Sequence, residues 1–238
     1  MTTRSKQSPV FGIMQDASMV DYPGRMAAVM FLPGCNFRCG FCHNAPLMGR
    51  VDVPTVSWAD VEKICRTFRN NWIESVVVTG GEPTLHPGLP HLMEQLRAWG
   101  FTIKLDTNGS RPAVLETLLP QVDYVAMDVK CAPGDYAANV GFADVEAVSR
   151  SIALIQEQAR QYEFRTTVIE AWHDAEKMRA MGEWVRGAKR HVLQAFVPRD
   201  DLPDPAFRGM RETPAEILHQ RAEVLRAYVE RVEVRGEF

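Results

Sequence analysis

The stretch that decides the fold of this chain runs from Pro33 to Pro46 and reads PGCNFRCGFCHNAP, with Cys35, Cys39 and Cys42 in the spacing C-x3-C-x2-C. It follows directly on an apolar run, residues 26–32, in which polar residues do not alternate with apolar ones. An unbroken apolar run of this length is typical of a strand that is buried on both faces. The sequence therefore predicts a cysteine loop at the carboxyl end of a buried strand.

Three thiolates at this spacing can surround one soft metal centre, which leaves zinc, copper(I) and an iron–sulfur cluster as candidates. In the zinc case His43 could be a fourth ligand, but the chain lacks a second C-x2-C pair. A 4Fe-4S cluster normally takes four cysteines, so three local cysteines would leave one iron open to a ligand that is not protein. The cysteine spacing alone does not choose between these metals, and three unrelated structural cysteines are the remaining alternative.

Composition places the chain among ordinary folded proteins. It has 238 residues, of which 46% are hydrophobic and 24% are charged, a length that suits one domain over residues 1–238. The net charge of −3 gives no basic surface for nucleic acid. No apolar run is long enough to span a membrane, and the polar start, residues 1–7, lacks the apolar core of a signal peptide. Five cysteines, three of them clustered, fit a reducing compartment, so we expect a cytoplasmic protein.

After the cysteine loop, apolar patterns of strand and helix type alternate to the end of the chain. Strands are predicted at residues 76–79, 101–105, 124–129, 164–169, 191–196 and 232–234, and helices at residues 57–68, 89–99, 111–119, 145–158, 175–186 and 213–229. Alternation of this kind implies right-handed crossovers and a parallel sheet. The units are too few for a closed eight-stranded barrel, so we expect an α/β fold with an open, partial (β/α)6 TIM-like barrel.

Shorter signals mark the ends of several elements. Residues 21–24, Asp-Tyr-Pro-Gly, predict a turn. Ser57 to Asp60 resembles a capping box, and Thr213 to Glu216 is a stronger one with proline at the first helical position. Residues 197–213 form the longest predicted loop, and such loops often carry function.

Polar residues collect where the predicted strands end, which is where parallel α/β folds place their active sites. They are Gly80, Gly81 and Glu82 after one strand, Asp106, Thr107 and Asn108 after the next, then Asp128 and Lys130, and finally Arg165 within the following strand. Taken alone, Gly80-Gly81 could be a plain turn, Asn108-Gly109 a hairpin, and Arg165 a solvated residue at a strand edge. Their shared position favours one site instead.

The cysteine motif with Phe41 before its last cysteine resembles the signature of the radical S-adenosylmethionine (radical SAM) superfamily, and Gly80-Gly81-Glu82-Pro83 is similar to its GGEP motif. The resemblance implies a 4Fe-4S cluster held by Cys35, Cys39 and Cys42, with SAM bound at the open iron. The two glycines let the backbone approach SAM, and the Glu82 carboxylate is expected to accept a hydrogen bond from the SAM ammonium.

Most of the chain resembles one branch of that superfamily, the anaerobic ribonucleoside-triphosphate reductase activating proteins and the related pyruvate formate-lyase activating enzymes. This branch implies that Asp106, Thr107 and Asp128 hold a sodium- or magnesium-like cation beside the SAM carboxylate, which Lys130 and Arg165 also contact. Asn108 is expected at the same site. Pyruvate formate-lyase activating enzymes have glycine where this chain has Tyr22, and Asp21 before it is a candidate contact to the partner's glycine loop.

The resemblance also implies a reaction. A flavodoxin or ferredoxin reduces the cluster, SAM is cleaved to methionine and a 5′-deoxyadenosyl radical, and that radical takes a hydrogen atom from a glycine of a glycyl-radical enzyme. Anaerobic ribonucleoside-triphosphate reductase is the expected partner. Two alternatives stay open: a radical SAM enzyme acting on a small molecule such as a nucleoside or deazapurine precursor, and a non-catalytic zinc-binding protein. Cys65 is expected in the core, and Cys131 has no assigned role.

Overall fold

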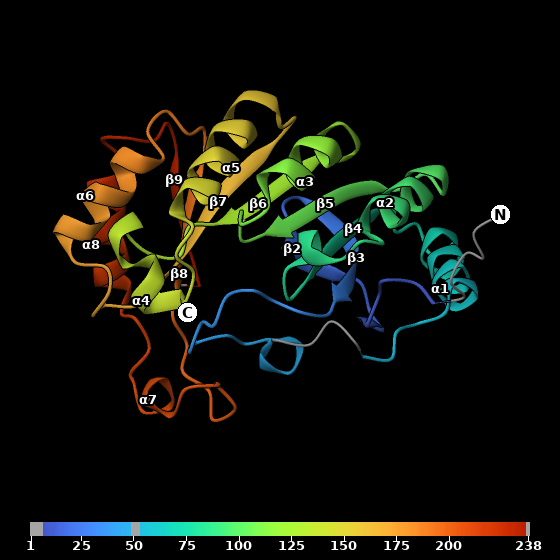
Figure 1. Ribbon diagram of the computed structural model, residues 1–238, viewed down its shortest axis with the longest axis horizontal. Coiled ribbons are helices and arrows are strands. Elements are labelled where there is room, and N and C mark those ends of the chain that lie inside the picture. Colours follow the sequence, from blue (N-terminus) through green and yellow to red (C-terminus); the bar gives the residue numbers. More distant parts are fainter. Residues whose placement is uncertain (1–6, 49–52, 237–238) are drawn as a thin grey trace.

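The architecture is a single curved sheet with helices on its outer face (Figure 1). The computed structural model describes residues 7–48 and 53–236. Its nine-stranded sheet has the order β1-β3-β4-β5-β6-β7-β8-β9, and β2 also pairs with β3. The strands are β1 Gly12–Ile13, β2 Ser18–Tyr22, β3 Arg25–Leu32, β4 Ser75–Gly80, β5 Thr102–Thr107, β6 Tyr124–Asp128, β7 Tyr162–Val168, β8 His191–Ala195 and β9 Val232–Arg235.

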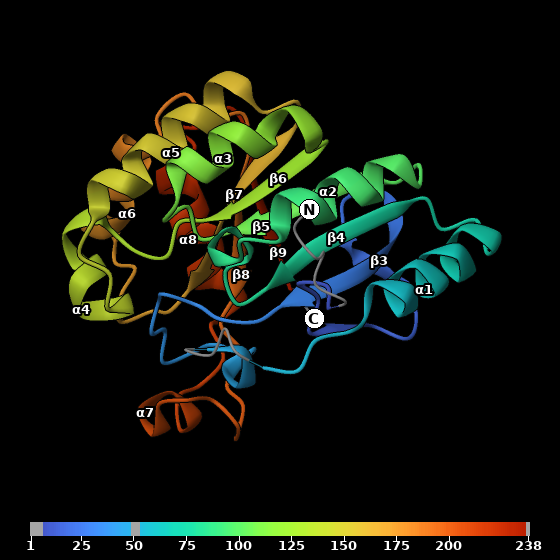
Figure 2. The ribbon, with the colours of Figure 1, turned by 45° about the vertical axis from the view of Figure 1, so that its right-hand side comes forward.

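Every neighbouring pair from β3 to β9 is parallel, as the alternating pattern predicted. The connecting helices line the outer face of the sheet in both views (Figures 1 and 2). They are α1 Trp58–Asn70, α2 Leu89–Ala98, α3 Pro112–Leu118, α5 Val145–Gln158, α6 Ala175–Trp184 and α8 Ala215–Leu225, with the short helices α4 Tyr136–Val140 and α7 Pro205–Arg208. Because β1 and β9 stand at opposite ends of the strand order, the barrel is open, and the predicted partial TIM-like barrel is confirmed.

The two faces of the sheet carry different kinds of side chain. Residues that point outward pack with the helices into the larger apolar core, for example Met30, Val78 and Leu105. Side chains alternate along a strand, so the intervening residues point to the inner face. There Ala27 and Val77 belong to a second, small apolar cluster on β3, β4 and β6. On β5 to β7 the inner face carries charged residues instead, and these form the floor of the site described below.

The first strands form an antiparallel hairpin that the sequence did not predict. Tyr22 pairs with Arg25, so the turn is centred on Pro23 and Gly24, the two residues from which it was predicted. Gly24 has a φ of 72°, which glycine adopts without strain. The register shifts within β2, and the exposed Met19 and Val20 follow one another instead of alternating with buried residues. This bulge hides the alternation by which a strand is normally found.

The two predicted helix caps had different outcomes. Ser57 caps α1 as predicted, because its hydroxyl accepts a hydrogen bond from the Asp60 amide. The capping box at Thr213 is wrong. Pro214 is the cap residue of α8, and the Thr213 hydroxyl donates instead to the carbonyl oxygen of Val168 at the end of β7. Helix α8 also ends at Leu225, earlier than the predicted Val229.

No helix within residues 7–48 and 53–236 is both long and apolar enough to cross a membrane. The prediction about the polar start of the chain falls mainly on residues 1–6, which lie outside the described residues.

The corrected role of Thr213 can be tested with the isosteric substitution Thr213→Val. Removing the buried hydroxyl leaves Val168 with one hydrogen bond fewer, so the free energy of unfolding should fall by about 1 kcal/mol. Urea unfolding of the wild-type and variant proteins measures the difference, and Thr213→Ser, which keeps the hydroxyl, is the control. Equal stability of Thr213→Val and wild type would contradict the assigned role.

Candidate active site

A cavity of about 600 Å³ lies between the cysteine loop and the inner face of the sheet, at the carboxyl ends of the strands. It brings together nearly all the residues that the sequence singled out. Those that line it are Cys35, Cys39, Phe41, Cys42, Gly80, Gly81, Asp106, Thr107, Asn108, Asp128, Lys130, Arg165 and Asp21. Glu82 is the exception. Cys65 and Cys131 are buried elsewhere and do not line the cavity.

The cysteine loop presents its sulfurs to this cavity with donors directed at one of them. The Phe37 amide lies 3.4 Å from Cys35 Sγ, and the Asn108 side-chain amide lies 3.9 Å from the same sulfur. N–H groups directed at sulfur are typical of thiolates that hold an iron–sulfur cluster, where they tune its reduction potential. The cavity therefore has sulfur donors on one wall and polar groups on the opposite wall. This arrangement fits an iron–sulfur cluster with a further ligand bound in the cavity.

Without a metal these three cysteines are thiols at neutral pH. Burial raises the pKa of Cys35 to about 11 and of Cys39 to about 12, and it also raises the pKa of Cys42. The nearby Lys130 ammonium opposes the shift for all three. Since metal centres bind thiolates, occupation of this site must release protons, and it should be weaker in acid.

The zinc alternative finds little support in the local geometry. The His43 ring lies 3.1 Å from the carbonyl oxygen of Val197, so it is engaged with the loop that starts there. Among the residues that the structure describes, no three His, Cys, Asp or Glu side chains converge on a point where one metal ion could sit.

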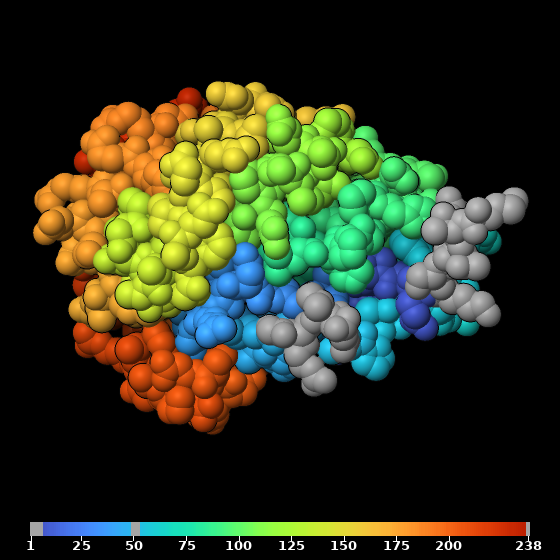
Figure 3. All heavy atoms as spheres, viewed as in Figure 1, coloured from blue at the N-terminus to red at the C-terminus, as the bar shows by residue number. Residues whose placement is uncertain are grey.

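Residues 197–213, the predicted long loop, pack against the cysteine loop. Figure 3 shows the two segments in direct contact, orange against blue. The Asp204 amide donates to the Gly40 carbonyl oxygen at 3.2 Å, and the Phe207 ring stands 6.0 Å from the Phe41 ring. A Cβ atom at Gly40 would lie 2.6 Å from the Phe207 ring, so a larger residue would displace that ring. This loop therefore fixes the outer side of the cysteine loop.

The Gly80-Gly81 pair allows two backbone segments to approach unusually closely. Gly80 has a φ of 127°, and a Cβ atom on it would lie 2.2 Å from the Leu32 carbonyl oxygen. On Gly81, a Cβ atom would lie 2.0 Å from the Gly34 carbonyl oxygen. Side chains cannot be accommodated at such distances, so glycine is required at both positions. The pair locks the start of the cysteine loop to the end of β4.

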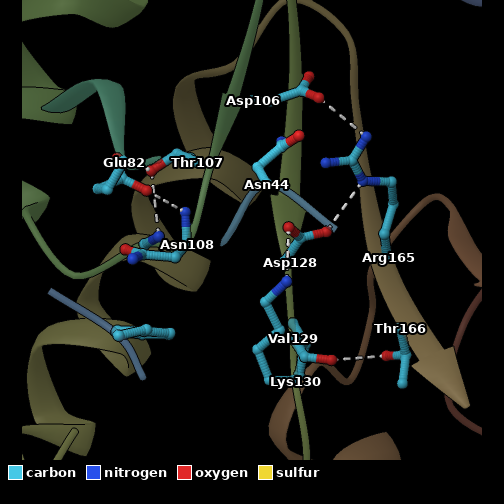
Figure 4. A network of polar contacts seen from close by, with 12 residues as sticks. Asn44, Glu82, Asp106, Thr107, Asn108, Asp128, Val129, Lys130, Arg165 and Thr166 are labelled. Atoms are coloured by element: carbon cyan, nitrogen blue, oxygen red, sulfur yellow. Dashed lines mark hydrogen bonds and ion pairs between the residues drawn. The ribbon is translucent and has the colours of Figure 1, made fainter. Parts of the chain in front are cut away.

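The Glu82 side chain is engaged within the protein, and its predicted hydrogen bond to the SAM ammonium stays a prediction. Its carboxylate is fully buried and accepts hydrogen bonds from the amide and hydroxyl of Thr84. It also accepts from the Thr107 hydroxyl at 2.8 Å and from the Asn108 amide at 2.6 Å (Figure 4). Both oxygens are thus in use, and the carboxylate is not on the cavity wall. The structure makes Glu82 a residue that positions Thr107 and Asn108.

Opposite the cysteines, Arg165 bridges two carboxylates on the inner face of the sheet (Figure 4). Its Nη1 lies 3.0 Å from Asp106 and its Nε 3.0 Å from Asp128, while the Lys130 ammonium lies 2.9 Å from Asp128. The Arg165 side chain is only 15% exposed, so the alternative of a solvated arginine at a strand edge is wrong. Although burial favours the neutral forms, these contacts lower the pKa of Asp128 to about 2 and raise that of Lys130.

This arrangement does not support the predicted sodium- or magnesium-like ion. The oxygens of Asp106 and Asp128 that were expected to hold it already contact cationic side chains of the protein. One of these, Lys104, was missed by the sequence reading, although its position two residues before Asp106 on a strand places it on the same face. Arg235, on β9, lines the cavity as well and was also missed.

Comparisons with known proteins identify the family of this chain. The family model of the radical SAM superfamily matches residues 29–179. A protein of Methanocaldococcus jannaschii with the provisional name glycyl-radical enzyme activating enzyme is 31% identical over 234 residues, 95% of each chain. A 7-carboxy-7-deazaguanine synthase of Neisseria meningitidis is 34% identical over 115 residues, 48% of this chain and 47% of that protein.

Solved structures share the fold at low sequence identity. Streptococcus suis SuiB bound to S-adenosylmethionine has a TM-score of 0.65 and 15% identity, with 88% of this chain and 52% of SuiB covered. A domain of pyruvate-formate lyase-activating enzyme from Bacteroides vulgatus has a TM-score of 0.52 and 20% identity, with 68% of this chain and 98% of that domain covered. At these identities the likeness concerns the fold.

The ion pairs of Asp128 predict a specific loss of stability in acid. Because Arg165 and Lys130 hold its pKa at about 2, below the ordinary 3.8, Asp128 contributes stability above the ordinary pKa and loses it as the pH falls through about 2. Between these pH values the free energy of unfolding should fall by about 2 kcal/mol more in wild type than in Asp128→Asn. Urea unfolding at a series of pH values measures it, and parallel pH profiles would contradict the assignment.

Proposed function

This chain belongs to the radical SAM superfamily, and we propose that it is an activating enzyme, an oxidoreductase that generates a glycyl radical on a partner enzyme. The observation that carries the proposal is the 31% identity to a provisionally named activating enzyme over 95% of both chains. The motifs around the cysteine loop and after the strands favour anaerobic ribonucleoside-triphosphate reductase as the partner. We also propose that residues 1–238 are one radical SAM domain, located in the cytoplasm of an anaerobically growing cell.

In this proposal Cys35, Cys39 and Cys42 hold a 4Fe-4S cluster. When bound, the cluster supplies the electron that cleaves SAM to methionine and a 5′-deoxyadenosyl radical, after reduction by a flavodoxin or ferredoxin. Gly80 and Gly81 bring backbone groups to the cavity wall, where they can bind the ammonium of SAM.

The remaining polar groups orient SAM from the opposite wall. Lys130 and Arg165 present positive charge to the cavity and can bind its carboxylate. The Phe41 ring lies 5.8 Å from the Lys130 ammonium, in the range of a cation–π contact. Asn108 donates to the Asn36 side chain at 3.0 Å and thereby ties the cysteine loop to the end of β5.

The surface beside the open seam of the barrel supports a protein substrate. Met19 and Val20 on β2 are 76% and 85% exposed, and the neighbouring Met14 and Asp21 line the cavity. Exposed apolar side chains that adjoin a catalytic cavity are typical of a surface that binds a macromolecule. The Ser18 hydroxyl donates to the Asp21 carboxylate and accepts hydrogen bonds from the amides of Val20 and Asp21, so Asp21 is held in place at the mouth as a contact for the partner's glycine loop.

A second candidate function is radical chemistry on a small molecule. The partial similarity to 7-carboxy-7-deazaguanine synthase favours it, since a nucleoside-like substrate would need the same SAM site and a different open side of the barrel. The apolar surface at Met19 and Val20 would then have no part in the reaction.

The first experiment is anaerobic reconstitution with iron and sulfide, followed by reduction and addition of SAM. We expect wild type and Cys65→Ala, which changes a buried cysteine outside the cavity, to form 5′-deoxyadenosine, and Cys39→Ala to form none. Chromatography measures the nucleoside, and EPR of the mixture with anaerobic ribonucleoside-triphosphate reductase detects the glycyl radical. Wild-type protein that contains zinc, no cluster and no nucleoside product would contradict the proposal.

The substitution Val20→Glu tests whether the partner is a protein. A charge on the apolar surface should slow glycyl-radical formation about tenfold and leave SAM cleavage without partner unchanged, because Val20 does not line the cavity. Trp72→Glu is the matched control, since Trp72 is equally exposed at 85% but precedes the start of β4, whereas the cavity lies at the end of that strand. If Val20→Glu activates the partner at the wild-type rate, the small-molecule alternative is favoured.

A further inference from the structure

Asp106 and Asp128, the two carboxylates expected to hold a metal cation, have no free oxygen. Asp106 Oδ1 contacts the Lys104 ammonium, and Asp106 Oδ2 lies 3.0 Å from Arg165 Nη1. Asp128 Oδ1 lies 3.0 Å from Arg165 Nε, and Asp128 Oδ2 lies 2.9 Å from the Lys130 ammonium. Each oxygen is thus matched by a positively charged donor of the protein, which is the position that a metal ion would otherwise take.

Thr107, the third expected oxygen ligand, is directed elsewhere. Its hydroxyl donates to Glu82 at 2.8 Å (Figure 4) and accepts from the Gly109 amide at 3.1 Å. Glu82 is fully buried and anchored by Thr84 as well, so the Thr107 hydroxyl cannot turn toward Asp106 without leaving that carboxylate with a lost hydrogen bond. The three oxygen groups therefore do not converge on a common point.

Lys104 supplies the positive charge that pairs with Asp106 without a metal ion. Its side chain is 1% exposed and lies beneath Asp106 on the inner face of β5. A buried lysine is stable only with a charged or hydrogen-bonding partner, and Asp106 is that partner. Lys104, Arg165 and Lys130 carry three positive charges against the two negative charges of Asp106 and Asp128, and the neighbouring buried Glu163 has its own ion pair with Arg235 at 2.8 Å. An added cation would therefore meet net repulsion in a poorly solvated place.

We propose that Lys104 and Arg165 replace a metal cation in this chain, and that SAM binding here, which rests on the proposed function, requires no sodium, potassium or magnesium. Lys104 is a positioning residue in this scheme, since it acts on SAM through Asp106 and Arg165. The single excess positive charge is then available to an anionic group of the ligand.

The first arm of the test uses the cluster-free protein and needs no SAM. Urea unfolding is measured in chloride salts of sodium, potassium, magnesium and tetramethylammonium at equal ionic strength, which keeps charge screening constant. We expect one stability in all four salts. Higher stability in a metal salt, dependent on its concentration, would reveal a bound metal ion and overturn the proposal.

The second arm measures SAM binding to the reconstituted protein by anaerobic equilibrium dialysis in the same salts. The wild-type dissociation constant should stay within about twofold. Lys104→Ala frees an Asp106 oxygen and leaves space for an ion, so its affinity should fall about tenfold in tetramethylammonium and recover in potassium or sodium. Lys104→Met removes the charge and fills the space, so metal salts should not restore its affinity. Lys63→Ala, on the exposed side of α1, is the control.

The outcomes separate the two proposals. Absence of SAM binding in every salt would refute the proposed function, and the unfolding arm would still decide whether a cation binds. Wild-type SAM binding that depends on a metal salt would refute the inference and leave the function intact. If the Lys104 variants do not fold, the wild-type measurements in four salts remain decisive.

Discussion

The forked contact of Arg165 with Asp106 and Asp128 is the interaction on which the site depends. It joins side chains from β5, β6 and β7, three neighbouring strands, and so fixes the relative height of their carboxyl ends. Carboxylates at that depth would be costly without charged partners, and the arginine supplies both with one rigid group. The polar wall of the cavity therefore exists before any ligand arrives, and SAM would meet a preformed surface.

The opposite wall is fixed by close packing instead of charge. Gly80 and Gly81 bring β4 against the start of the cysteine loop, and Phe207 presses on Gly40 from the other side. The loop is thus held between the sheet and residues 197–213, and the buried Glu82 connects it to the end of β5 through Asn108. The cysteine loop has little regular structure, but it can position three sulfurs because its neighbours allow it few other conformations.

Periodic features could be predicted from the sequence, and features that depend on distant partners could not. The strands and the longer helices after residue 57, the open parallel barrel and the grouping of polar residues at strand ends all follow from local patterns, whereas the short helices α4 and α7 were not predicted. The partners of Glu82 could not be predicted, because its motif does not reveal that Thr84, Thr107 and Asn108 donate hydrogen bonds to its carboxylate. Lys104 and the role of Thr213 were missed for the same reason, since each depends on a side-chain partner that the pattern of one element does not specify.

The charged inner face of β5 to β7 also has a thermal consequence. Hydration of charged groups becomes less favourable as temperature rises, so the penalty for burying Lys104, Arg165 and their carboxylates shrinks on warming. The apolar core on the outer face is built of hydrophobic side chains and has no such penalty to lose. The polar wall that faces the cysteines should therefore lose relatively little of its stability in a warm cell.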